Sequence, residues 1–134
     1  MKLLVLATDP VDAGDVREAL GGDADLEGSE VLVVSPAVNS SPLAFWVSDS
    51  DEAIAEARSA AQRTAEALRD RGAQARATTG ESEPLLALQD ALATYEADRV
   101  LVFVRADDQA RYREDDVVGE AERRFGVPVT EVRR

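Results

Sequence analysis

The stretch LLVLATDP, residues 3–10, begins with five consecutive apolar residues and ends in polar and turn-forming ones. Two similar apolar runs follow it, VLVV at 31–34 and VLVFV at 100–104. Continuous apolar runs, as opposed to alternating ones, are typical of strands that are buried on both faces of a sheet. Because helical patterns separate these runs, the order predicts right-handed crossovers and a parallel sheet covered by helices. The expected fold class is therefore α/β.

The longest helix is expected from about Ser50 to Arg71. Asp49 followed by Glu52 has the pattern of a capping box at its start, and Gly72 suits a C-terminal stop. Its expected inward-facing residues are spaced by three and four along one face: Ile54, Ala57, Ala61, Thr64 and Leu68.

Three more helices and two more strands complete the expected elements. One helix begins near Pro84, which suits a first helical turn, another spans about 114–125, and a short one spans about 11–20. Residues 73–79 are expected to form a weak strand, mainly because they lie between two helices. The prediction is thus a sheet of five strands with helices between them.

The last apolar run, Val127 to Val132, is expected to be an edge strand. It contains Pro128, which cannot donate a hydrogen bond to a sheet ladder and is therefore confined to sheet edges. An exposed edge has to be covered, charged or paired, and pairing with a second copy would bury Val127 and Val129. We therefore expect a homodimer whose interface includes Val127, Pro128 and Val129.

Composition limits the chemistry that the chain can perform. Its 134 residues suit one domain, residues 1–134, by the usual size of about 150 residues per domain. It has no His and no Cys, which excludes Ser-His-Asp and Cys-His nucleophiles, disulfides and zinc sites built from nitrogen and sulfur ligands. Lys2 is the only lysine, so there is no phosphate-binding loop of the G-x-x-x-x-G-K-[ST] type. We expect no catalytic residues, no metal site and no enzyme activity.

The chain is strongly acidic, with a formal net charge of −12. Such a charge repels nucleic acid and anionic membrane surfaces at long range, so neither is an expected partner. The acidity suits either a high-salt environment or simple solubility, and the sequence does not decide between them. The apolar start at residues 3–7 is shorter than the roughly 7–15 residues of a signal peptide's apolar region, and no later run approaches the ~18 needed to span a bilayer. A cytoplasmic protein is expected.

Two segments near the predicted strand ends are candidates for a binding site. Open parallel sheets bind ligands outside the carboxyl ends of their strands, which is where Asp9 follows the first strand. Asp9 either caps the following helix or turn, or contacts a ligand. The long connection at 35–48 contains Phe45 and Trp46, which either anchor the loop or form part of a lid.

A third candidate is the segment RADDQARYREDD, residues 105–116, after the fourth predicted strand. Arg105, Arg111 and Arg113 are suitable ligands for an anion, but five carboxylates accompany these three arginines. A carboxylate about 4 Å from a phosphate charge costs from ~1 kcal/mol in water to ~4 kcal/mol at an effective dielectric constant of 20. Binding of phosphate without a metal is therefore disfavoured. The alternatives are a divalent metal that bridges carboxylates and phosphate, or a solvated face.

The order of these segments resembles the universal stress protein family, within the adenine-nucleotide alpha hydrolase-like folds. The resemblance covers almost the whole chain and rests on five segments: KLLVLATD (2–9), EVLVVSP (30–36), TTGESEPLLALQDAL (78–92), ADRVLVFV (97–104) and FGVPVTEV (125–132). It implies a three-layer α/β/α sandwich with a five-stranded parallel sheet of order 3-2-1-4-5. It also implies pairing of the fifth strands across a dimer.

The resemblance breaks at the phosphate site. Family members that bind ATP carry G-x-x-G after the fourth strand, followed further on by G-[ST]. Here only Gly119 lies near the last glycine, and Glu120 follows it in place of Ser or Thr. Asp9 matches the family's acidic residue after the first strand, and Val33 and Val34 match the strand whose backbone meets adenine. The phosphate half is thus lost, whereas the adenine half is retained.

Two functions are therefore expected as alternatives. The first is a non-catalytic homodimeric scaffold, without a cofactor, that acts in stress response or regulation by contacting an unknown protein partner and binds little or no ATP. The second is an adenine-nucleotide module that binds ATP or AMP with Mg, possesses slow hydrolysis at most, and uses Asp9 and the arginines of the 105–113 segment. A receiver-like phosphorylation domain is disfavoured because the acidic pair and the late lysine it needs are absent.

Overall fold

The computed structural model describes residues 2–21, 26–36, 50–80, 84–104 and 117–133. Strands and helices alternate along these residues from the N-terminus to the C-terminus. In chain order the elements are β1 (Lys2–Ala7), α1 (Ala13–Ala19), β2 (Glu30–Pro36), α3 (Ser50–Arg69), β3 (Gln74–Gly80), α4 (Pro84–Thr94), β4 (Arg99–Val104), α6 (Val117–Phe125) and β5 (Val129–Arg133). The alternation confirms the α/β class.

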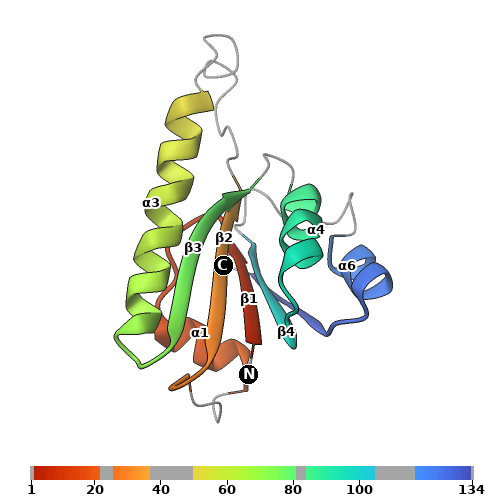
Figure 1. Ribbon diagram of the computed structural model, residues 1–134, viewed down its shortest axis with the longest axis horizontal. Helices are drawn as coiled ribbons and strands as arrows, with labels where there is room; N and C mark the ends of the chain where they lie inside the picture. The colour runs from red at the N-terminus through yellow and green to blue at the C-terminus, as the bar shows by residue number, and fades with distance from the viewer. Residues whose placement is uncertain (1, 22–25, 37–49, 81–83, 105–116, 134) are drawn as a thin grey trace.

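The five strands form one parallel sheet in the order β3-β2-β1-β4-β5 (Figure 1). The central strand β1 is in register with β2 on one side and β4 on the other, with Val5 opposite both Val33 and Leu101. This order confirms the expected topology, including the weak strand β3 and the edge position of β5. The connection through α1 leads from β1 to β2 on one side of β1. The connection through α4 leads from β3 back to β4 on the other side of β1. The strand order therefore reverses between β1 and β4.

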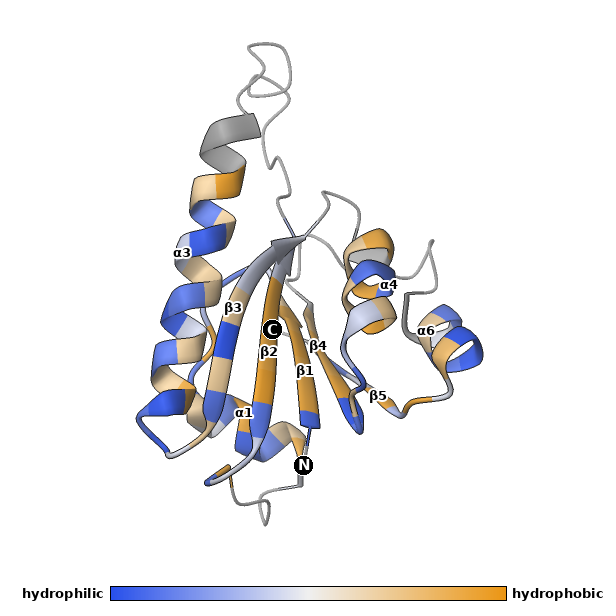
Figure 2. Cartoon of the chain, viewed as in Figure 1, coloured by the Kyte–Doolittle hydropathy of each residue, from blue (hydrophilic) through white to orange (hydrophobic). Residues whose placement is uncertain are grey.

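Helices cover both faces of the sheet, as Figure 1 shows: α1 and α3 lie on one face, α4 and α6 on the other. Alternate residues of β1 point to opposite faces, so Leu3 and Val5 pack with α1 and α3, whereas Leu4 and Leu6 pack with α4 and α6. Most of these strand side chains are fully buried. Figure 2 shows the consequence, because the central strands are apolar over most of their length while the helices carry polar outer surfaces. This is why the apolar runs are continuous.

Helix α3 confirms the expected inward face with one exception. Ala57, Ala61, Thr64 and Leu68 are buried, but the side chain of Ile54 is 38% exposed. Twenty helical residues span about 30 Å, whereas seven strand residues span about 23 Å. The first turns of α3, which include Ile54, therefore extend past the tip of β3 (Figure 1).

The remaining boundaries differ from expectation by a few residues. Helix α3 ends at Arg69, and Gly72, with φ +89°, donates its N–H to the Arg69 carbonyl at 3.0 Å, so it terminates the helix as predicted. Helix α1 begins at Ala13, two residues later than predicted. The capping residue predicted at Asp49 and the 114–116 start of α6 lie outside the described residues. Within the described residues, no helix is long and apolar enough to cross a bilayer.

Candidate functional site

The carboxyl ends of β1 and β2 lie side by side where the strand order reverses, which is the usual ligand position in such sheets. Thr8, Asp9 and Pro10 follow β1 there, and the side chain of Asp9 is exposed. Ser35 and Pro36 end the neighbouring strand β2. The described part of the candidate site therefore consists of these two strand ends.

Asp9 is not the helix cap that one of its two interpretations required. The N-cap of α1 is Asp12, whose side chain accepts a hydrogen bond from the Asp15 N–H at 2.8 Å, while the Asp15 carboxylate accepts the Asp12 N–H at 3.5 Å. The helix begins late because the N–H of Val11 is held by the Thr64 hydroxyl at 3.0 Å. The exposed position of Asp9 beside the strand ends is compatible with its other interpretation, contact with a ligand.

Val33 and Val34 lie inside the sheet. Both side chains are buried, and their peptide groups lie between β1 and β3, in register with Val5 and Leu6 on one side and Ala77 and Thr78 on the other. A base can therefore reach neither backbone without opening the sheet. Contact of Val33 and Val34 with a base stays a prediction.

Ser35 is a residue of this region that the sequence interpretation missed. It is fully buried, and its hydroxyl donates to the Thr8 carbonyl at 3.4 Å, which links the ends of β2 and β1. Pairing of β2 with β1 stops at Val34, whereas pairing with β3 continues to Pro36. Ser35 and Pro36 are therefore the residues of β2 that extend beyond its pairing with β1. The only signal in the sequence is a single hydroxyl at the end of an apolar run.

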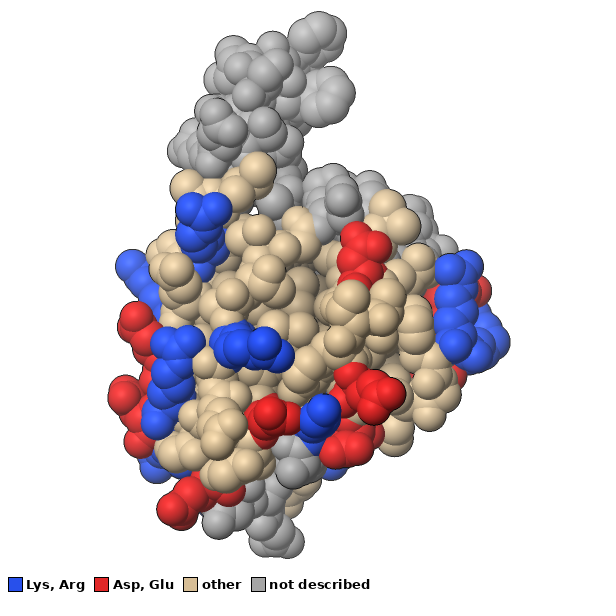
Figure 3. All heavy atoms as spheres, viewed as in Figure 1, with Lys and Arg blue, Asp and Glu red and all other residues tan. Residues whose placement is uncertain are grey.

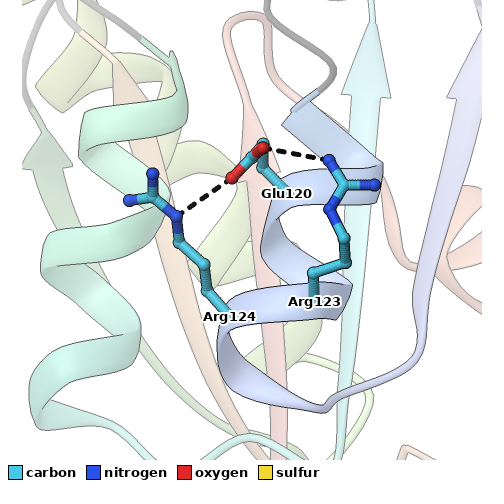
Figure 4. Close-up of polar contacts among 3 residues, drawn as sticks. All are labelled: Glu120, Arg123 and Arg124. Carbon is cyan, nitrogen blue, oxygen red and sulfur yellow. Dashed lines mark hydrogen bonds and ion pairs between the residues drawn. The ribbon is translucent and has the colours of Figure 1, made fainter.

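Helix α6 carries a compact ionic group in its first turn. Figure 4 shows Glu120 between two arginines of the same helix: Arg123 Nη2 lies 3.0 Å from Glu120 Oε1 and Arg124 Nε lies 3.0 Å from Glu120 Oε2. The hydrogen bond from Arg123 is the main reason that the pKa of the Glu120 carboxyl lies below its usual range, and the charges of both arginines lower it further. Glu120 therefore stays ionised in the first turn of α6.

Several predicted site residues lie outside the described residues: Arg105, Arg111, Arg113, Phe45 and Trp46. In the part of the chain that the structure describes, no group of three acidic residues is placed to hold a metal ion.

The predicted interface residues lie at the free edge of the sheet. β5 pairs with β4 alone, and Val100 N–H donates to the Pro128 carbonyl at 3.0 Å. Val127 and Val129 are half-buried and pack against the core under α4 and α6, while Pro128 is exposed. The other side of β5 has no neighbouring strand in the described sheet.

A hollow of about 770 Å³ lies at the opposite end of the sheet from the candidate site. Lys2, Glu30 and Asp98 line it, and they hold the start of β1: Lys2 Nζ lies 3.8 Å from Glu30 Oε2, and the Lys2 N–H donates to Asp98 Oδ2 at 2.8 Å. Nearby, burial is the main cause that raises the pKa of the Tyr95 hydroxyl, which donates to the Glu30 carbonyl at 3.1 Å. These groups have structural roles.

Comparison with solved structures identifies the fold. A universal stress protein family protein from Arabidopsis thaliana, solved with AMP bound, superposes over 100% of this chain and 92% of its own with a TM-score of 0.54 and 14% identity. The chain has the universal stress protein fold. A hypothetical protein, PH0823, is similar over 99% of this chain and 96% of its own, with a TM-score of 0.52 and 14% identity. No protein-family model matches the chain, and neither does any curated protein sequence.

The universal stress protein fold was predicted from the order of five segments, and its strand order agrees with the described sheet. Asp12, not Asp9, caps α1, and Val33 and Val34 pair with strands on both sides. A turn-stabilising role for Asp9, and contact of Asp9, Val33 or Val34 with a nucleotide, stay predictions. β5 lies at the edge of the described sheet as predicted, but it begins at Val129, so Val127 and Pro128 precede the strand. Their role in an interface stays a prediction.

Proposed function

We propose that this universal stress protein-like domain is a non-catalytic homodimeric scaffold of the cytoplasm, acting in stress response or regulation through protein contacts and binding little or no ATP. The observation that carries the proposal is that the outer edge of β5, beside half-buried Val127 and Val129, has no neighbouring strand in the described sheet. Antiparallel pairing of two β5 edges about a two-fold axis would satisfy the outward peptide groups and cover these valines.

The direction of the peptide groups in β5 supports such pairing. The Pro128 carbonyl accepts from Val100 of β4, and successive residues of a strand point their peptide groups to opposite sides. Those of Val129 and Glu131 therefore point away from β4, toward the open edge. Pro128 lacks an N–H, but its carbonyl faces β4. The missing N–H therefore does not remove a hydrogen bond from the outer side of β5.

Weak ATP binding is supported by the charge at α6. An ionised Glu120 in the first turn already interacts with the positive end of the helix dipole and with Arg123 and Arg124. A phosphate at this position would have to displace or face that carboxylate. The net charge of −12 adds a repulsive field.

Glu131→Pro is expected to convert the dimer to a monomer, because proline removes an N–H that points to the proposed interface and leaves the β4 ladder intact. Sedimentation velocity at about 10 μM should show a dimer for the parent chain and for the matched control Glu131→Ala, which changes the same side chain but keeps the N–H. Circular dichroism checks that all three are folded. A parent chain that sediments as a monomer, or a Glu131→Pro variant that stays dimeric, contradicts the proposal.

A second candidate, an adenine-nucleotide module, is favoured by one observation: the similar Arabidopsis structure contains AMP. In this alternative, exposed Asp9 and the strand ends at Ser35 and Pro36 would hold the nucleoside, and Arg105, Arg111 and Arg113 would hold phosphate. Magnesium would be needed to offset the carboxylates among those arginines.

Calorimetric titration with ATP and with AMP, each with and without magnesium, separates the two candidates. If the scaffold proposal is right, no heat of binding is expected up to about 1 mM nucleotide. A dissociation constant above that concentration corresponds to a binding free energy weaker than roughly −4 kcal/mol. A dissociation constant in the micromolar range would establish the second candidate instead. In that case Arg111→Ala or Arg113→Ala should weaken binding, whereas the control Arg63→Ala, an exposed arginine of α3, should leave it unchanged.

A further inference from the structure

The outer edge of β3, at the opposite side of the sheet from β5, has no neighbouring strand in the described sheet. The N–H of Gln74 donates to the Ser29 carbonyl at 2.7 Å, toward β2. Because peptide groups alternate in direction, those of Ala75, Ala77 and Thr79 point outward. The Ala75 carbonyl accepts a hydrogen bond from Arg69 Nε at 2.8 Å, which confirms this direction and leaves Ala77 and Thr79 as the open part of the edge.

A cavity of about 200 Å³ lies directly against this open part. Ala77, Thr78 and Thr79 form one wall, and Arg58 and Gln62 of α3 lie across from them. Arg58 is exposed and makes no ion pair or hydrogen bond with another described residue. The cavity therefore brings together a guanidinium group, a side-chain amide and outward backbone N–H groups, all of which are hydrogen-bond donors.

The surroundings of this edge are basic in a chain that is acidic as a whole. Arg58 and Arg69 flank β3 from α3, and Arg76 is exposed on the opposite face of the strand. Figure 3 shows basic side chains over α3 and β3 on this side of the molecule, with acidic side chains along the outer side of α3, and none of the residues that line the cavity is acidic. The chain as a whole has a net charge of −12, so a cavity lined by an arginine and no acidic residue differs in charge from the rest of the molecule. It favours an acidic partner.

We propose that the β3 edge accepts an extended acidic segment of a partner protein as an additional strand, with one carboxylate side chain in the cavity against Arg58. Successive side chains of a strand point to opposite faces. If one carboxylate faces α3 and Arg58, the next faces the other side of the sheet, where Arg76 lies. Backbone pairing with Ala77 and Thr79 supplies affinity, and the two arginines select for carboxylates.

Other occupants fit this edge less well. A second copy of this chain paired through β3 would bring the same arginines of two molecules together, which is unfavourable for like charges. Nucleic acid has no extended peptide backbone that could pair with the outward peptide groups of Ala77 and Thr79. The site is separate from the β5 edge proposed for the dimer, so it does not depend on the oligomeric state.

The test is a titration followed by the backbone amide signals in NMR spectra of the isotope-labelled full chain. The probe is the blocked peptide acetyl-TEEVEET-amide, and its control is acetyl-TQQVQQT-amide, which has the same length without charge. Saturable shifts are expected at Ala75, Ala77 and Thr79 with the acidic peptide, with a dissociation constant of about 1 mM or tighter.

Matched variants separate strand addition from general attraction. Arg58→Ala should weaken binding about tenfold, as expected for a charge-assisted hydrogen bond, whereas Arg63→Ala should change it less than about twofold. Arg63 is the control because it is an exposed arginine of the same helix that does not line the cavity. Ala77→Pro should abolish the shifts, since it removes the outward N–H at an edge position where proline is tolerated. Amide spectra of each free variant check its fold.

Four results would overturn the inference. These are no saturable shift up to about 5 mM peptide, equal binding of the uncharged peptide, equal losses in Arg58→Ala and Arg63→Ala, or shifts that map to β5 in place of β3. Sedimentation of the same samples reports the dimer separately, so a failure at β3 is distinguishable from a failure at β5.

Discussion

Replacing Gly80 by alanine is expected to destabilise the protein by about 1–3 kcal/mol, as overpacking of a close contact does. A Cβ atom at Gly80 would lie 2.6 Å from the Ala87 Cβ and 3.3 Å from the Ala87 Cα, both on α4, and 3.1 Å from Val34 Cγ1. The Ala87 atoms belong to or adjoin the helix backbone, so they cannot turn aside. Elsewhere in a strand, the same change would stabilise by roughly 0.5–1 kcal/mol, because glycine loses more conformational freedom on folding.

A double-mutant cycle measures this contact. Urea unfolding of Gly80→Ala, Ala87→Gly and the double variant gives the interaction free energy between the two positions. Ala87→Gly alone should cost about 1 kcal/mol of helix propensity, and the double variant should be at least ~0.5 kcal/mol more stable than the sum of the single changes predicts. Stability of Gly80→Ala equal to or above that of the parent chain would contradict the close approach of α4 to β3. Helix α4 also contacts α6, so the distance between α4 and β3 affects the position of the helix that carries Glu120.

Thr64→Val is expected to lower the free energy of unfolding by about 1–3 kcal/mol, the usual cost of leaving a buried hydrogen-bonding group without its partner. The Thr64 hydroxyl is buried, accepts the Val11 N–H at 3.0 Å and donates to the Ala60 carbonyl at 2.9 Å. Valine has nearly the shape of threonine but cannot accept the hydrogen bond. Thr64→Ser keeps the hydroxyl and loses one methyl group, for which roughly 0.8 kcal/mol is expected.

Stability should therefore decrease in the order parent, Thr64→Ser, Thr64→Val in thermal or urea unfolding. Hydrogen exchange adds a local readout, because the Val11 amide should exchange faster in Thr64→Val and stay protected in Thr64→Ser. If Thr64→Val were as stable as Thr64→Ser, the hydrogen bond to Val11 would have no energetic role. The contact matters for the candidate site because it fixes the chain just after Asp9, between β1 and α1.

Much of the fold was predictable from the sequence. The runs LLVLA, VLVV and VLVFV identified the central strands because residues on both faces of those strands have to be apolar. Pro128 led to the correct expectation that β5 is an edge strand, although Pro128 lies one residue before the strand and its carbonyl faces β4. The order of the sheet came from the resemblance to universal stress proteins and agrees with the structure.

The candidate site was less predictable, since its geometry depends on which turn the chain takes after β1. Only Asp9 was considered as a cap from the sequence, but Asp12 is the cap, and Thr64, 53 residues away, holds Val11 just before it. Ile54 has the spacing of the buried face of α3, yet it is exposed because the helix is longer than the strand beneath it.

The sequence by itself determined the fold class and the central strands, because burial of a strand on both faces is visible in a few consecutive apolar residues. Only the tertiary structure decided that Gly80 meets Ala87, that Thr64 holds Val11, and that Arg58 faces the open peptide groups of β3. Each of these contacts joins different elements of the fold. Local patterns do not encode them, since they depend on the packing of helices onto the sheet.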